Sequence, residues 1–123
     1  MTEATVFEVV GGQPFFDALV ERFYERVERD PALRRLYPAD LGPGKRALAL
    51  FLGQYWGGPP AYSEEKGHPR LRMRHAPFAI GGPERDAWLA AMLDAVDGSD
   101  APAAAREMMR EYFEMASTAM INR

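Results

Sequence analysis

Glycine and proline divide this chain into segments of helical length. Glycine pairs occupy positions 11–12, 57–58 and 81–82, and prolines follow the second and third pairs at 59–60 and 83. Proline favours the first turn of a helix and disrupts a helix interior, while glycine often ends a helix. We therefore expect several helices of roughly 8 to 20 residues, separated by sharp corners.

Apolar residues recur at helical spacing in four of these segments. The predicted helices span roughly 15–29, 44–56, 83–97 and 102–120. The stretch 59–68 is polar and turn-rich and has no period of its own, so it is predicted to be a loop. No segment alternates apolar and polar residues as a half-buried strand does. The sequence therefore predicts an all-α fold.

The composition fits one globular domain, 1–123, and excludes several classes of function. Apolar residues make up 47% of the chain, yet no apolar run reaches the roughly 18 residues that span a membrane. The net charge of −3 disfavours nucleic acid as a partner. The first residues lack the pattern of a secretory signal, so a cytoplasmic protein is expected. Because cysteine is absent, the chain offers no disulfide, thiolate nucleophile or iron–sulfur cluster.

The segment 67–78 carries the most specific chemical signal. Pro69 and Pro77 leave room for only about two turns of helix, and His75 lies near the end of that helix. Three alternating arginines between 70 and 74 crowd around it, and guanidinium groups pair well with carboxylates. An imidazole on a rigid helix beside arginines suits an axial ligand of haem iron, with the arginines near the haem propionates. The alternative is a histidine that only packs or is solvated, which is the commoner role of a lone histidine.

Three aromatic residues with polar tips form a second signal. Tyr24, Tyr37 and Trp88 lie on or beside the expected apolar faces. Each alone is most simply a packing residue whose polar tip finds a backbone partner. Together with one axial histidine, they indicate an apolar cavity whose hydroxyl and indole donors face a bound diatomic molecule.

Five segments of the chain closely resemble the group II truncated haemoglobins. These segments are 22–26, 34–38, 51–59, 67–78 and 84–88. The resemblance runs in order from about residue 6 to about residue 120 and so covers nearly the whole chain. It implies a two-over-two helical sandwich, shorter than a full globin, around a non-covalent haem b.

The resemblance also implies roles for individual residues. His75 matches the proximal histidine that binds the iron. Tyr24 and Tyr37 match distal positions near the bound gas, and Trp88 matches the tryptophan that marks group II. The other residues that the resemblance places against haem are Leu48, Phe51, Leu52, Tyr55, Arg46, Arg74, Phe78 and Met92.

Two positions bear on the distal side and on the propionates. Gly44 falls where full-length globins carry a distal histidine, and it fits the small residue that group II usually has there. Ala47 stands where relatives often carry an arginine for a propionate. We therefore expect Arg46 or the arginines between 70 and 74 to take that role.

Three functions follow from these observations. The first is a haem protein that binds O2 reversibly and with high affinity, and also CO, NO or sulfide, as a carrier or store. The second is a haem enzyme, a nitric oxide dioxygenase or a peroxidase, which needs a separate reductase because the sequence shows no flavin motif. The third is a haem-free helical module whose exposed arginines meet an acidic partner. Homo-oligomers are compatible with the resemblance, but no long exposed apolar stripe fixes a number of subunits.

Overall fold

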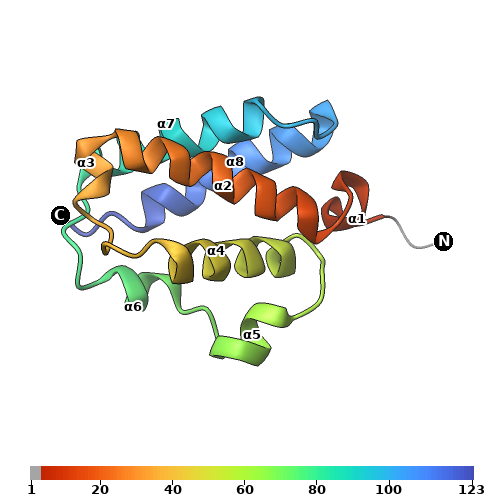
Figure 1. The fold of residues 1–123 in the computed structure, drawn as a ribbon, viewed down its shortest axis with the longest axis horizontal. Helices are drawn as coiled ribbons and strands as arrows, with labels where there is room; N and C mark the ends of the chain where they lie inside the picture. The colour runs from red at the N-terminus through yellow and green to blue at the C-terminus, as the bar shows by residue number, and fades with distance from the viewer. Residues whose placement is uncertain (1–3) are drawn as a thin grey trace.

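The structure, a computed structural model, describes residues 4–123, and all regular secondary structure in that range is helical (Figure 1). The predicted all-α fold is confirmed. The helices are α1 (Val6–Val10), α2 (Gln13–Arg29), α3 (Pro31–Arg34), α4 (Gly42–Tyr55), α5 (Ala61–Lys66), α6 (Leu71–His75), α7 (Gly82–Asp97) and α8 (Ala103–Ala119).

Local sequence explains where the helices begin. Proline occupies the first turn of α2, α3, α4 and α7, where its missing N–H costs no hydrogen bond. Asp30 ends α2, and its carboxylate accepts a hydrogen bond of 3.0 Å from the Ala32 N–H, which caps α3. At the start of α7, the Gly81 N–H donates to the Glu84 carboxylate at 2.8 Å.

The long helices form two layers. α2 packs on α4, α7 packs on α8, and contacts between α2 and α7 join the two pairs (Figure 1). In each pair the helices run in opposite directions. Burying each large apolar side chain between them contributes about 1.5–3 kcal/mol. The largest fully buried side chains are Phe16, Phe23, Phe113, Leu19, Leu33, Leu52, Met92 and Met109.

The segment predicted as a loop at 59–68 contains α5, so that prediction was wrong. Tyr62 is 5% exposed and packs edge-on against Phe51, with 5.7 Å between the ring centroids. The Gln54 side chain accepts from the Ser63 N–H at 2.9 Å and donates to the Ser63 hydroxyl at 2.7 Å. The residues that stabilise α5 therefore belong to α4. For this reason the sequence of α5 alone does not show the apolar spacing of a helix.

The short helix predicted between Pro69 and Pro77 is α6. Arg70 precedes it with φ 46° and ψ 53°, a left-handed conformation that is unfavourable for a residue with a side chain. The Arg70 N–H donates to Nδ1 of His68 at 3.1 Å, so the His68 side chain accepts a backbone hydrogen bond just before α6. None of the residues of α6 is buried, so this helix lies outside the main core.

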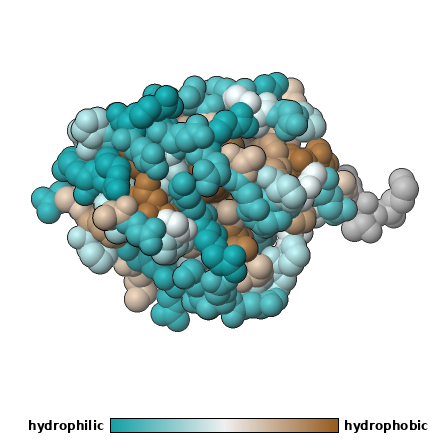
Figure 2. Space-filling view, in the orientation of Figure 1, coloured by the Kyte–Doolittle hydropathy of each residue, from teal (hydrophilic) through white to brown (hydrophobic). Residues whose placement is uncertain are grey.

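The visible face of the molecule is mainly hydrophilic, and apolar side chains show through in small separate areas (Figure 2). Within residues 4–123, no helix combines the length and the apolar character needed to cross a bilayer.

Candidate functional site

An apolar cavity of about 380 Å³ lies among α2, α4, α6, α7 and α8. Its volume falls within the range of roughly 300–1,000 Å³ that small-molecule and cofactor sites occupy. Most of the residues predicted for the site line this cavity. They are Tyr24, Tyr37, Leu48, Phe51, Leu52, Arg74, His75, Phe78 and Trp88.

Three predicted residues are not brought to the cavity wall. The Arg46 guanidinium turns outward and pairs with the Glu65 carboxylate at 2.9 Å. Tyr55 is 48% exposed and stacks on Tyr112 of α8, with 4.1 Å between the ring centroids. Met92 is fully buried in the helical core. A helical stripe tells which residues share a face, but not which neighbour covers that face.

Sequence reasoning missed part of the wall. Tyr112, Ala116 and Met120 of the α8 region line the cavity, although none of the residues predicted for the site came from the helix at 102–120. Ile80 and Arg85 also line it. Arg85 lies within the resembling segment 84–88 but was given no role in the site, and no pattern marked Ile80. Nε of Arg85 is buried and has no hydrogen-bond partner among the described residues.

His75 supplies the metal-ligating chemistry of the cavity. Its Nδ1 lies 2.6 Å from the backbone oxygen of Leu71, one turn earlier in α6. Because a carbonyl oxygen only accepts, Nδ1 carries the proton and donates it to that oxygen. In the neutral ring, Nε2 is then left with its lone pair and can bind a metal. A hydrogen bond of this kind also fixes the plane of the ring.

The residues present fit haem. Among residues 4–123, no group of three or more His, Cys, Asp or Glu side chains could hold a metal ion together. The wall instead offers one imidazole and a large apolar surface. One protein nitrogen is enough for a metal whose other ligands come from its cofactor, as those of iron in a porphyrin do.

Polar aromatic side chains form another part of the wall. The rings of Tyr24 and Tyr37 meet edge to face, with centroids 5.6 Å apart. Burial raises the pKa of Tyr24 to about 12. Burial also raises the pKa of Tyr37, as does the nearby Tyr24, while a hydrogen bond with the Trp88 side chain lowers it in part. Both hydroxyls therefore keep their protons at neutral pH and remain able to donate.

Gly44 leaves the space that the Tyr24 hydroxyl occupies. A Cβ atom added at position 44 would lie 2.9 Å from Oη of Tyr24, closer than such atoms approach without a shift. The small residue at this point of α4 therefore lets the hydroxyl reach the cavity.

Arg74 brings positive charge to the cavity edge. Its Nε donates to the Pro69 oxygen at 2.7 Å, and its Nη2 donates to the Lys66 oxygen at 3.3 Å. The guanidinium also lies over the Tyr62 ring, 5.9 Å from the centroid. These contacts hold the charge in place without a carboxylate from the protein.

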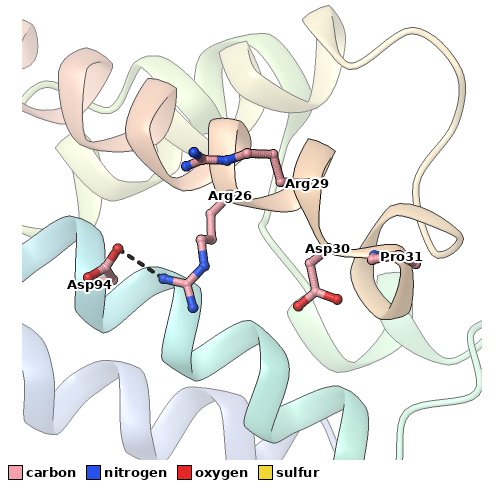
Figure 3. Close-up of a pocket in the computed structure, with 5 residues that line it drawn as sticks. All are labelled: Arg26, Arg29, Asp30, Pro31 and Asp94. Atoms are coloured by element: carbon pink, nitrogen blue, oxygen red, sulfur yellow. Dashed lines mark hydrogen bonds and ion pairs between the residues drawn. The ribbon is translucent and has the colours of Figure 1, made fainter.

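A second depression lies between the end of α2, the start of α3 and α7, and it is polar and more open. Its lining residues are Arg26, Arg29, Asp30, Pro31 and Asp94 (Figure 3). Arg26 and Asp94 form an ion pair of 2.9 Å, and both side chains are exposed. Exposed pairs of this kind contribute little, about 0–1 kcal/mol, and we assign no function to this surface.

Comparison with known proteins agrees with this geometry. The sequence pattern described as the bacterial-like globin family matches residues 5–122. A group 2 truncated hemoglobin of Bacillus subtilis, YjbI, is 43% identical over 111 residues, which are 90% of this chain and 84% of the relative. The crystal structure of a hemoglobin from Chloroflexus aurantiacus superposes with a TM-score of 0.97 at 57% identity, covering 98% of this chain and 100% of that one.

A third comparison concerns the X-ray structure of a truncated oxygen-avid haemoglobin from Bacillus subtilis. It superposes with a TM-score of 0.91 at 41% identity and covers 97% of this chain and 100% of that one. The chain belongs to the bacterial-like globin family. Its predicted resemblance to the group II truncated haemoglobins, with their two-over-two fold, is confirmed. Membership of a globin family implies haem and small gaseous ligands.

Proposed function

We propose that this protein binds haem b through Nε2 of His75 and takes up O2 reversibly and with high affinity, as a carrier or store in the cytoplasm. CO, NO and sulfide would occupy the same place. The observation that carries the proposal is the hydrogen bond from Nδ1 of His75 to Leu71, which leaves Nε2 free on the wall of an apolar cavity. When bound, haem supplies an iron atom with one coordination position open to such ligands.

The apolar wall would hold the porphyrin faces. Leu48, Phe51 and Leu52 of α4 and Phe78 after α6 present apolar surface to the cavity. Burial of this surface removes water from the porphyrin and strengthens every polar contact made inside. Arg74 would pair with a propionate, and the position of its charge at the cavity edge supports this role.

The polar aromatic side chains would set the affinity. Tyr24, Tyr37 and Trp88 bring two hydroxyls and one indole N–H to the cavity. A neutral hydrogen bond contributes about 1 kcal/mol, and one to a charged acceptor about 1.5–3 kcal/mol. Since about 1.4 kcal/mol is a tenfold change in an equilibrium constant, two such bonds give very slow O2 release. The similar structure from Bacillus subtilis is described as oxygen-avid, which agrees with this expectation.

Hemin titration of the purified protein tests the proposal. We expect one hemin per chain, and absorption spectra of the reduced protein that change on adding O2 or CO. His75→Ala should lose hemin, whereas His68→Ala should retain it, because His68 does not line the cavity. A colourless protein whose absorption spectrum does not change when hemin is added would instead favour the haem-free module. Equal hemin retention by the two variants would refute ligation by His75.

A haem enzyme is the second candidate function. The observation that favours it is the gathering of three proton donors on one cavity, because donors that hold a ligand tightly also suit its chemical conversion. Nitric oxide dioxygenase and peroxidase activities would both need electrons from a separate reductase. Steady-state consumption of NO or peroxide with an added reductase, compared with simple oxygenation, distinguishes an enzyme from a carrier.

A further inference from the structure

The helix that carries His75 has no buried face to hold it. All residues of α6 are half-buried or exposed, so core packing does not fix its position. Before His75, the side chain of Arg74 joins this segment to α5, because it donates to the oxygens of residues 66 and 69 and lies over the Tyr62 ring. In turn, α5 packs on α4. A second connection to the core lies after His75, at the other end of the segment.

Asn122, just after α8, supplies that connection. Its Nδ2 donates to the backbone oxygen of Phe78 at 2.8 Å and to that of His75 at 3.3 Å. Its Oδ1 accepts from the Ile80 N–H at 2.9 Å. The backbone N–H groups of Asn122 and Arg123 both donate to the Ile80 oxygen, at 2.8 and 3.2 Å.

The three residues that Asn122 holds are all part of the cavity wall. His75, Phe78 and Ile80 each line the cavity, and one side chain binds the backbone of all three. The asparagine amide is suited to this because it has two donors and an acceptor on one planar group. α8 in turn packs on α7 within the core. These hydrogen bonds therefore connect the core, through Asn122, to the backbone of His75.

We propose that Asn122 is a positioning residue that fixes the height and tilt of the His75 imidazole in the cavity. The proposal rests on the proposed function, since it concerns the ring that would bind iron. Asn122 does not line the cavity. Its effect on haem passes through the backbone of residues 75–80.

Two substitutions separate the contributions of the amide. Asn122→Ala removes all three side-chain bonds and keeps the backbone ones. Asn122→Asp keeps the acceptor for the Ile80 N–H but removes the donors to His75 and Phe78. Arg123→Ala is the matched control, because its contact with Ile80 is made by the backbone N–H and survives. Circular dichroism checks that all three variants fold.

Three measurements then test the proposal. In the hemin-loaded protein we expect both Asn122 variants to lose hemin to apomyoglobin about tenfold faster than Arg123→Ala, a change of about 1.4 kcal/mol. In the ferrous form, the iron–histidine stretching band in resonance Raman spectra should shift and broaden in both. In the protein as purified, amide hydrogen exchange at Ile80 should accelerate about tenfold in Asn122→Ala.

The outcomes distinguish this proposal from the proposed function. Hemin loss and a Raman band equal to those of the control would overturn the positioning role. Unchanged exchange at Ile80 would overturn the contact itself. If the wild-type protein takes up no hemin, the proposed function fails, and faster exchange at Ile80 would still support the contact between Asn122 and the 75–80 segment.

Discussion

At the scale of single residues, Trp88 makes the sharpest prediction about ligand binding. It lines the cavity and packs on Phe23, with 5.4 Å between the ring centroids. Trp88→Phe keeps an aromatic ring at this position and removes the indole N–H. We expect the O2 dissociation rate to rise roughly two- to tenfold, since one hydrogen bond contributes about 0.5–1.5 kcal/mol and about 1.4 kcal/mol is tenfold. Stopped-flow displacement of O2 by CO measures it.

The other tryptophan provides the control for that experiment. Trp56 does not line the cavity, and its indole N–H is buried without a partner among the described residues. Trp56→Phe should leave the O2 dissociation rate as it is in the wild type. If Trp88→Phe also leaves the O2 dissociation rate unchanged, the indole N–H of Trp88 does not stabilise bound O2.

Tyr24 makes a prediction about stability at alkaline pH. Folded Tyr24 keeps its proton up to a pKa of about 12, whereas an unfolded tyrosine loses its proton near pH 10. Between these values the unfolded state binds fewer protons, so the free energy of unfolding falls as pH rises. The contribution of one group is at most about 1.4 kcal/mol per pH unit. Urea unfolding between pH 9 and 11 measures the slope.

Replacing the hydroxyl isolates the contribution of that side chain. Tyr24→Phe should make the decline above pH 10 less steep, because the group that ionises in the unfolded state is gone. Below pH 9 the free energy of unfolding should depend on pH in the same way in Tyr24→Phe and in the wild type. An identical alkaline slope in both proteins would contradict the assignment to Tyr24.

At the scale of elements, α5 depends on contacts that its own sequence does not contain. Tyr62 is nearly fully buried against Phe51 and lies under the Arg74 guanidinium. We expect Tyr62→Ala to destabilise the protein by about 3–5 kcal/mol, the range for removing a large aromatic side chain from a core. Tyr62→Phe is the matched control and should cost far less. Urea unfolding measures both, and equal losses would show that α5 does not depend on the ring.

The elements also show what the sequence could and could not predict. α2, α4, α7 and α8 were predictable because each carries an apolar stripe at helical spacing and has a proline in or just before its first turn. α5 was not, because its stabilising partners Phe51 and Gln54 belong to another helix. α6 was predictable only in outline. Its length follows from two prolines, but its attachment through Asn122 depends on residues 42 to 47 positions away.

The candidate site divides in the same way. His75, Tyr24 and Trp88 were predicted from residue type and motif, and the structure places all three on one cavity. Tyr55 shares a helical stripe with Phe51 but turns to Tyr112, because α8 passes beside the end of α4. The local sequence shows which residues share one face of a helix. Which other helix packs on that face depends on the whole fold.

At the scale of the whole molecule, the cavity is a gap in the core that a ligand would fill. Side chains from the long helices line it on several sides, while α6 closes it without any buried residue of its own. A ligand that binds only the folded state raises stability by about 2.7 kcal/mol when its concentration is a hundred times Kd. Hemin should therefore stabilise the molecule and tighten the region of α6 most.

Thermal unfolding with and without hemin tests this at the level of the whole chain. For a domain of 123 residues, the gain corresponds to a rise in Tm of roughly 10 °C. In His75→Ala the rise should be much smaller, because hemin then gains only the apolar contacts of the wall. Hydrogen exchange should show the largest protection at 71–80, because that segment has no buried residue and several of its side chains line the cavity. Uniform protection with no preference for that segment would mean that hemin binds elsewhere than beside His75.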